Sequence, residues 1–380
     1  MDFYRICAKI DIGAIEHNIK LIKERIGNSK LMLVVKADAY GHGAPGVVKA
    51  LERLADYFAV AEMGEALELR AHGIRTPILI LGYTSPSQYE LSLEHGITLT
   101  IFTPESARAL SEVCVRTGKT ARVHFAVDTG MGRIGWQVCG QGADEAADAA
   151  RLPGIFVEGV FSHFATADGE ENSFAEEQCT QFERFCEMLE SRGVHIPLKH
   201  RNNSAGIVKF GKRYDMVRAG ILIYGLYPSE SVRAFAGKEF SLRPAMELIT
   251  RITHIKELDA GKPISYGSTF VTARKTRVAT LPVGYADGYP RALSGKGEVL
   301  VRGVRCPILG RVCMDQMMID ISAVPEAKVE ERAVLMGRDG GEFISAEEIA
   351  AHADTINYEF VCGVAKRVPR VYFGSTVLDG

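Results

Sequence analysis

Short and almost wholly apolar runs recur through residue 225 and alternate with stretches of helical periodicity. Most of the runs lack polar alternation, which is typical of strands buried on both faces of a parallel sheet. We expect strands at residues 31–36, 57–61, 77–82, 98–102, 122–128, 156–164, 198–202 and 215–218.

The segments between these runs have features of amphipathic helices. Isoleucines at positions 15, 19, 22 and 26 recur at helical spacing, and Thr103 followed by Pro104 is a typical helix start. Eight strands alternating with helices predict an α/β fold, a closed (β/α)8 barrel of the TIM type rather than an open sheet.

The pattern changes after about residue 240. Residues 246–256 alternate in part between apolar and polar positions, and later apolar runs at 277–281, 299–301 and 333–336 are separated by turns that contain glycine. This indicates a mainly β C-terminal domain. We place the boundary within residues 229–238 and expect a barrel at 1–238 and a β domain at 239–380. The first twelve or so residues could pack with the β domain.

Composition narrows the range of functions. The chain has 380 residues, is 47% hydrophobic and carries 45 basic and 47 acidic residues, without a basic block of the kind that binds nucleic acid. The chain shows neither a signal peptide nor an apolar stretch near the roughly 20 residues that span a bilayer. Eight cysteines lack the spacing of zinc sites. We expect a cytoplasmic protein with free thiols, without a metal, a membrane segment or a nucleic-acid partner.

Lys36 ends the first apolar run and precedes Ala-Asp-Ala-Tyr-Gly-His-Gly. A lysine at the carboxyl end of a barrel strand lies where such enzymes place their chemistry and could form a Schiff base or carry a proton. A lone lysine at this position could equally reach solvent.

Further polar residues follow other expected strands. Arg133 lies in a glycine-rich loop after residues 122–128, and His163 ends the run 156–164, where a single histidine is more often a core residue. Asn203, Ser204 and the segment Arg218-Ala-Gly220-Ile221 follow the last two strands, where barrels often bind phosphate through backbone N–H groups. In the second half, glycine-flanked Tyr266 and Tyr285 would by themselves indicate turns.

Taken in order, these strings resemble the alanine racemases, pyridoxal-phosphate enzymes of fold type III, along nearly the whole chain. The matching strings are Val35-Lys-Ala-Asp-Ala-Tyr-Gly-His-Gly, Asp128-Thr-Gly-Met-Gly-Arg, Asn203-Ser, Met216-Val-Arg, Ser265-Tyr-Gly, Gly284-Tyr-Ala-Asp-Gly, Cys313-Met-Asp, Thr355-Ile-Asn-Tyr-Glu and Arg367-Val-Pro-Arg. Each alone could arise by chance, whereas the ordered set is highly specific.

The resemblance implies that Lys36 binds the cofactor as a Schiff base and then acts as the base on one face of the substrate Cα. Tyr266, contributed by the partner subunit of a head-to-tail homodimer, would act on the opposite face, with help from a hydrogen bond of His163. Two bases are needed because a single base returns its proton to the same face and regenerates the starting enantiomer.

The resemblance also assigns roles to other residues. Arg218 would face the pyridine nitrogen, and because an arginine offers only donors, that nitrogen would stay unprotonated, which disfavours transamination. The other cofactor-binding residues would be Tyr40, His163, Asn203, Ser204, Gly220, Ile221 and Tyr358. Arg133 and the backbone N–H of Met314 would bind the substrate carboxylate, and the access corridor would include Tyr285, Asp315, Arg291, Arg311 and Arg370.

One position departs from the family pattern. Many members carry a lysine that becomes carbamylated two residues before Asp-Thr-Gly, and here that position is Ala126. Carbamylation there is excluded, and we expect another anion, such as chloride or a nearby carboxylate, to orient Arg133.

The expected activity is interconversion of L- and D-alanine, an isomerase reaction that supplies D-alanine for peptidoglycan of the cell wall. Serine or serine/alanine racemases of the vancomycin-resistance type are the alternative, but these have a membrane segment and a polar replacement for Tyr358. A pyridoxal-phosphate carrier without catalysis would stop after the barrel. Decarboxylases of related fold usually keep a cysteine and acidic pattern that this sequence lacks.

Overall fold

The computed structural model describes residues 5–374, which divide into two compact units. The barrel unit comprises Ala14–Asp38 and Ala44–Pro244, and the β unit comprises residues 5–13, 39–43 and 245–374. The chain therefore leaves the barrel unit briefly after Asp38, and passes finally into the β unit at Ala245, a few residues after the boundary that the sequence suggested.

Eight parallel strands form the barrel unit. In spatial order they are β10 (Met216–Ala219), β2 (Lys30–Val34), β3 (Tyr57–Val60), β4 (Ile78–Ile80), β5 (Ile97–Ile101), β6 (Ala121–Asp128), β8 (Ile155–Phe161) and β9 (Leu198–His200). Backbone hydrogen bonds from Asp215 to Lys199 (3.1 Å) and from Arg218 to Asn202 (2.9 Å) link the last strand to the first. The predicted (β/α)8 barrel is confirmed.

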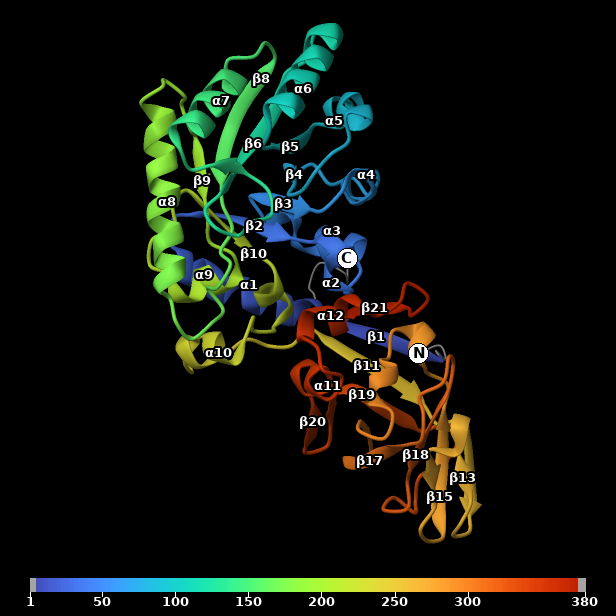
Figure 1. The fold of residues 1–380 in the computed structure, drawn as a ribbon. Coiled ribbons are helices and arrows are strands. Elements are labelled where there is room, and N and C mark those ends of the chain that lie inside the picture. Colours follow the sequence, from blue (N-terminus) through green and yellow to red (C-terminus); the bar gives the residue numbers. More distant parts are fainter. Residues whose placement is uncertain (1–4, 375–380) are drawn as a thin grey trace. The chain divides into compact units, whose positions relative to one another are not determined.

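Helices follow the strands and pack outside them, as α6, α7 and α8 do in Figure 1. The helices of this unit are α1 (Ile12–Ile26), α3 (Ala44–Leu51), α4 (Met63–Ala71), α5 (Tyr89–Glu94), α6 (Pro104–Thr117), α7 (Gly140–Ala150), α8 (Ser173–Glu190), α9 (Ser204–Lys209) and α10 (Glu230–Ala236). The four isoleucines of α1 are buried, as their spacing predicts. Thr103 caps α6 by accepting a hydrogen bond from the N–H of Ser106 at 3.2 Å.

A left-handed helical turn lies where the chain leaves the barrel unit after Asp38. In α2 (Lys36–Tyr40), Ala37, Asp38, Ala39 and Tyr40 all have φ between 52° and 54°. Such a run is costly for L-residues, so other contacts must hold it. The Asp38 carboxylate accepts a hydrogen bond from the N–H of Ala44 (2.7 Å), and Glu65 accepts one from the N–H of Ala37 (2.6 Å).

The β unit is built on one long, largely antiparallel sheet. Its order is β12 (His254–Leu258), β15 (Thr276–Leu281), β18 (Met317–Asp320), β17 (Val304–Leu309), β16 (Glu298–Val301), β19 (Arg332–Asp339), β11 (Met246–Arg251), β1 (Ile6–Asp11) and β21 (Arg370–Phe373), and β20 (Glu342–Ile344) pairs with β19. Residues of β11 alternate between buried and half-buried, which explains the partial alternation in the sequence. A mainly β second half is confirmed.

Shorter elements complete the β unit. The hairpin of β13 (Pro263–Ile264) and β14 (Phe270–Val271) carries a 3₁₀ turn at Tyr266–Ser268, and α11 (Ala346–His352) and α12 (Asn357–Cys362) lie near the end of the chain. Further 3₁₀ turns occur at Tyr285–Asp287 and Arg291–Leu293.

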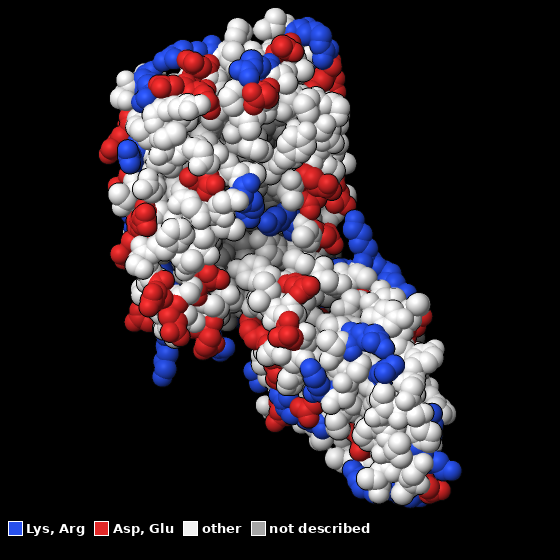
Figure 2. All heavy atoms as spheres, in the orientation of Figure 1, with Lys and Arg blue, Asp and Glu red and all other residues white. Residues whose placement is uncertain are grey.

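All eight cysteines are free thiols. Within residues 5–374, none of the helices has the length and hydropathy needed to span a bilayer. On the face displayed in Figure 2, acidic and basic side chains are interspersed over both units.

Candidate active site

The carboxyl ends of the barrel strands collect most of the polar residues that the sequence singled out. Lys36 and His163 each lie two residues beyond the end of a strand, β2 and β8 respectively. Ser204 begins α9 after β9, and Gly220 directly follows β10. Because the carboxyl ends of parallel strands lie at the same end of a barrel, these residues share one edge.

Arg218 is a fully buried cation on β10. Its Nη1 donates to Nδ1 of His200 (2.8 Å) and to the His200 carbonyl (2.9 Å). Its Nη2 donates to the carbonyls of Ser162 (2.6 Å) and Arg201 (2.9 Å). Burial, together with the nearby Arg133 and Arg201, lowers the pKa of Arg218 to about 9. The guanidinium therefore stays charged at neutral pH and is rigidly oriented.

His163 is a neutral imidazole beside Arg218. Burial lowers its pKa to about 3, and the positive charges of Arg218, Arg133 and Lys36 act in the same direction. Its Nδ1 lies 3.4 Å from Nη2 of Arg218, which can only donate. Its Nε2 lies 3.4 Å from Nδ2 of Asn203, which is also a donor, so a hydrogen-bond donor faces each ring nitrogen. These interactions also place three cations around one histidine, a setting suited to an anionic ligand.

The starts of two short helices lie at the same edge. The side chain of Asn203 caps α9 by accepting from the N–H of Gly206 at 3.0 Å. The hydroxyl of the buried Ser204 accepts from the N–H of Gly220 at 3.0 Å, and the buried Ile221 begins a 3₁₀ turn (Ile221–Tyr224). Backbone N–H groups at such starts suit a phosphate group.

Two tyrosines of the β unit pack against each other. The rings of Tyr40, at the end of the left-handed turn, and Tyr358, on α12, have centroids 6.1 Å apart and are tilted by 51°. Burial raises the pKa of Tyr40 far above its ordinary value, so its hydroxyl stays protonated.

Tyr266 lies on an exposed and tightly shaped turn. The residue is 71% exposed, and its neighbours Ser265 and Gly267 have φ of 66° and 73°. The Ser265 hydroxyl donates to the carbonyl of Arg311 at 2.7 Å, which holds the turn. Tyr266 borders an open depression of about 500 Å³ that is lined by Ser265, Cys313, Met314, Asp315, Gln316 and Met318.

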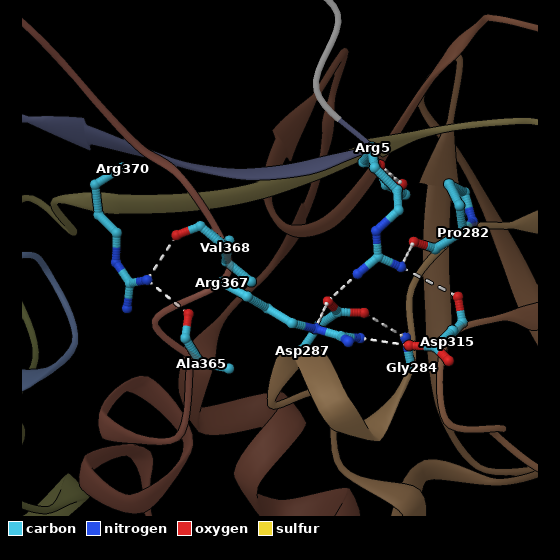
Figure 3. Close-up of polar contacts among 10 residues, drawn as sticks. Arg5, Pro282, Gly284, Asp287, Asp315, Ala365, Arg367, Val368 and Arg370 are labelled. Carbon is cyan, nitrogen blue, oxygen red and sulfur yellow. Dashed lines mark hydrogen bonds and ion pairs between the residues drawn. The ribbon is translucent and has the colours of Figure 1, made fainter.

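A buried carboxylate organises the loop that carries Tyr285. Asp287 pairs with Arg5 and with Nε of Arg367 (2.8 Å), and it accepts from the N–H of Gly284 at 2.9 Å (Figure 3). Arg367 also contacts Oδ1 of Asp315 at 2.6 Å. We call these residues, Arg5, Asp287, Asp315 and Arg367, the Asp287 clamp.

The loop that carries Tyr285 is also hydrogen-bonded to the loop that carries Met314. The carbonyls of Cys313 and Met314 accept hydrogen bonds of 3.0 Å from the N–H groups of Tyr285 and Ala286. The clamp therefore fixes two loops at once, one with Tyr285 and one with Met314 and Asp315.

Three arginines expected in an access corridor differ in their surroundings. The half-buried Arg370 donates to the carbonyls of Gly41, Val364, Ala365 and Val368, two of which appear in Figure 3. Arg370 therefore holds the backbone at Gly41 and at residues 364–368 together. Arg311 lies under Gly267, and Arg291 is exposed on its 3₁₀ turn. Their place in a corridor stays a prediction.

Comparison with known proteins settles the family. Residues 10–228 match the family described as alanine racemase, N-terminal domain, and residues 245–372 match alanine racemase, C-terminal domain. The chain belongs to the alanine racemase family. An alanine racemase of Desulforamulus reducens is 47% identical over 372 residues, which cover 97% of this chain and 99% of that protein.

Solved structures of alanine racemases have the same fold. That from Clostridium difficile 630 is 40% identical with a TM-score of 0.93, and the match covers 98% of this chain and 97% of that one. The Bacillus anthracis enzyme with bound L-Ala-P is 37% identical with a TM-score of 0.93, and both chains are covered in full (100%).

The barrel unit fits the pyridoxal phosphate on which the alanine racemase family depends. A lysine able to bind an aldehyde lies at the strand edge, and the fully buried Arg218 can only donate toward a ring nitrogen. The helix starts at Ser204 and Ile221 suit the phosphate, and the surrounding cations suit its negative charge.

Ala126 lies in the core of the barrel. It is fully buried on β6, in register with Phe161 of β8. The methyl side chain offers no amine, so the carbamylated lysine of many alanine racemases has no counterpart at this position.

Several polar residues of the structure were not identified from the sequence as site residues. His124, Glu158 and His200 lie on barrel strands and are buried, and Arg5 and Asp287 belong to the clamp. A charged or imidazole side chain within an otherwise apolar strand was the available signal. That signal alone does not tell which polar residues meet across the barrel.

Proposed function

We propose that this chain interconverts L- and D-alanine, with Lys36 and Tyr266 as the two bases. The cluster of Lys36, Arg133, His163 and Arg218 at the barrel edge carries the proposal, because it provides an amine and an anion-binding environment in one place. The substrate is inferred from relatives that are named alanine racemase and that match this chain over 97–99% of their own length.

Pyridoxal phosphate, when bound, accepts the negative charge that develops at the substrate Cα after its proton is removed. The ε-amine of Lys36 removes or returns the proton on one face of Cα. The phenolic oxygen of Tyr266 does so on the other face, as a phenolate when it removes the proton and as a hydroxyl when it returns one. Inversion requires both groups, since either alone can only return a proton to the face from which it came.

His163 is arranged to assist Tyr266. Nδ1 of His163 faces Nη2 of Arg218, and Nε2 faces Nδ2 of Asn203, each at 3.4 Å. We propose that, with Tyr266 in the site, Nε2 carries the ring proton and donates it to the phenolic oxygen, which stabilises the negative charge left after that oxygen releases its proton. This places a neutral donor, rather than a second cation, beside the tyrosine.

The remaining residues bind and orient. We assign the cofactor phosphate to Tyr40, Ser204, Gly220, Ile221 and Tyr358, with Asn203 shaping the helix start. We assign the substrate carboxylate to Arg133 and the backbone N–H of Met314. The access corridor then comprises Tyr285, Asp315, Arg291, Arg311 and Arg370.

We further propose that the protein is a cytoplasmic homodimer with shared active sites, and that it supplies D-alanine for peptidoglycan. Tyr266, Tyr285 and Met314 are 71%, 42% and 53% exposed in the single chain, which suits a surface that a second copy covers. In this arrangement Tyr266 of the partner subunit faces Lys36. Eight free thiols suit a reducing compartment.

Chiral chromatography of L-alanine and, in parallel, L-serine after incubation with the holoenzyme tests the assignment. We expect alanine to approach a near-equal mixture of enantiomers and serine to convert more slowly. Some serine turnover is expected because a small pocket discriminates weakly against an added hydroxyl. Faster conversion of serine would move the assignment to a serine racemase, and no conversion of either would contradict the proposal.

A further inference from the structure

A continuous line of polar side chains crosses the interior of the barrel from Arg218. Nη1 of Arg218 contacts Nδ1 of His200 at 2.8 Å, and Nε2 of His200 lies 2.7 Å from Nδ1 of His124. Nε2 of His124 lies 3.4 Å from Oε2 of Glu158, whose Oε1 accepts from Arg122 at 2.7 Å. The two imidazoles are fully buried, and the Arg122 side chain is 63% exposed.

The direction of each hydrogen bond follows from the arginine. Arg218 can only donate, so Nδ1 of His200 must accept and its proton must lie on Nε2. That proton is then donated to Nδ1 of His124, which places the His124 proton on Nε2, facing the carboxylate of Glu158. Every donor in the line therefore points from Arg218 toward Glu158.

The charges along the line are also fixed by their surroundings. Burial lowers the pKa of both His124 and His200, so the two rings are neutral. The pKa of Glu158 is lowered, because the hydrogen bonds from His124 and Arg122 and the charge of Arg122 outweigh its burial. One carboxylate is thus connected to one buried guanidinium through two neutral rings.

We propose that Glu158 is a positioning residue that acts through His124 and His200 to keep Arg218 charged and oriented as a donor toward the ring nitrogen of the cofactor. This inference rests on the proposed function, since it concerns the same cofactor site. Hydrogen bonds in such a line polarise one another, so the negative charge of Glu158 makes His200 a stronger acceptor for Arg218. A carboxylate in direct contact with Arg218 is not needed.

A titratable side chain, Tyr57, and an aromatic ring, Phe161, pack against the line. The Tyr57 hydroxyl, from β3, hydrogen-bonds Glu158, and burial raises its pKa, so it remains a neutral donor. At the other end Phe161 stacks on the His200 ring, with centroids 5.1 Å apart, and Arg218 lies over Phe161 at 5.2 Å. The Phe161 ring thus packs against both partners of the Arg218–His200 hydrogen bond.

The first test is Glu158→Gln, compared with Glu158→Asp, which keeps the charge, and with Glu52→Gln. Glu52 accepts hydrogen bonds from Arg75 and Thr76 outside the line, so its variant is a matched control. Without the Glu158 charge, Arg218 loses its proton more readily and the ring nitrogen can gain one. The visible absorption band of the bound cofactor should then change its pH dependence.

A second readout is the side reaction in which alanine leaves as pyruvate and its amino group stays on the cofactor. The pyruvate formed per racemisation event should rise about tenfold in Glu158→Gln, a size typical of a lost hydrogen bond to a charged group. Glu158→Asp should restore most of the wild-type ratio, and Glu52→Gln should not differ from wild type. A folded Glu158→Gln enzyme with an unchanged ratio and an unchanged absorption band would overturn the proposal. Wild-type racemisation itself tests the proposed function separately.

If Glu158→Gln fails to fold, NMR spectroscopy of the wild-type holoenzyme tests the proposal instead. With ¹⁵N-labelled histidine, the nitrogen shifts of His124 and His200 report which nitrogen carries the proton. A scalar coupling between their nitrogens across the 2.7 Å contact assigns the pair. Both rings should be neutral with the proton on Nε2. A protonated ring, or a proton on Nδ1 of His200, would contradict the line of donors.

Discussion

Lys36 and Tyr266 would act on opposite faces of one carbon, so loss of either base should stop inversion but not every proton exchange. In Tyr266→Phe we expect racemisation to fall by several orders of magnitude. Cα of one alanine enantiomer should still incorporate deuterium from D₂O, because Lys36 can remove its proton and return a deuteron to the same face. Chiral chromatography coupled to mass spectrometry measures both outcomes.

The same change at an exposed tyrosine provides the control. Tyr83 is 64% exposed in the barrel unit, and Tyr83→Phe should leave both inversion and exchange as in the wild type. If Tyr266→Phe inverts alanine at the wild-type rate, Tyr266 is not the second base.

At the residue scale, sequence patterns located strand-end residues well and interior partners poorly. Lys36 and Arg218 could be predicted because each lies at or next to a strand end within a specific string. His124 and His200 are single histidines within strands, and their partnership depends on which strands meet across a closed barrel. Which strands meet depends on closure of the whole barrel, so the residues around each histidine do not predict that the two are partners.

At the element scale, the left-handed turn after Lys36 invites a test of backbone strain. Ala37 has φ of 52° and is exposed, so its substitution alters the backbone preference with little effect on packing. Ala37→Gly should leave the thermal stability at or above that of the wild type, since glycine adopts positive φ freely. Ala37→Val should lower the free energy of unfolding by about 1–2 kcal/mol, because a branched side chain clashes in this region.

Thermal unfolding of both holoenzymes, followed by circular dichroism, measures this difference. Equal melting temperatures for Ala37→Gly and Ala37→Val would mean that the turn is not left-handed in solution. Each variant is the control for the other, because both change the same exposed position.

Regular elements were predictable because their patterns are periodic, whereas this turn has no periodic pattern. Mostly apolar runs marked all eight barrel strands, because strands buried on both faces are largely apolar. The sequence Lys36-Ala-Asp-Ala-Tyr40 contains no glycine, so its positive φ values contradict local preference. Tertiary contacts, such as the hydrogen bond from the Ala37 N–H to Glu65, impose the conformation.

The Asp287 clamp joins loops that the sequence places far apart, and its buried carboxylate should matter most (Figure 3). Asp287→Asn leaves the cations of Arg5 and Arg367 without their shared partner. We expect a loss of about 2–3 kcal/mol, less than for a fully buried pair because both arginines are partly exposed. The KM for alanine should rise as the Met314 loop loosens.

Asp315→Asn is the matched control, because Asp315 is an exposed partner of the same Arg367. Its effect on stability should stay below about 1 kcal/mol. Chemical denaturation and steady-state kinetics of both variants separate the two carboxylates. Equal losses of stability would contradict a special role for the buried one.

At the scale of the whole molecule, neutral histidines should make stability depend on pH. The pKa of His42 is lowered to about 4 and that of His163 to about 3, both mainly by burial, and His124 and His200 are shifted in the same direction. An unfolded histidine binds its proton near pH 6.5. The unfolded state therefore takes up more protons as the pH falls below that value, so stability is greatest above about pH 6.5 and is lost toward pH 3–4.

Each such histidine contributes a slope of at most about 1.4 kcal/mol per pH unit in this range. His42→Asn should make the slope between pH 6.5 and 5 shallower, since asparagine does not titrate. His195 is exposed, and His195→Gln should leave the slope unchanged. Urea denaturation at several pH values measures it, and identical slopes for all three proteins would contradict a neutral His42 in the fold.

If each active site takes residues from two chains, the activity of a dimer depends on which variants pair in it. In a mixed dimer of Lys36→Ala and Tyr266→Phe, one site combines both defects and the other has Lys36 from one chain and Tyr266 from the other. Random exchange of equal amounts of the two variants should restore about a quarter of wild-type sites from two inactive parents. If each chain used its own Tyr266, every site would lack one base and mixing would restore nothing. Native mass spectrometry must confirm that mixed dimers formed, so that an inactive mixture rules out a shared site.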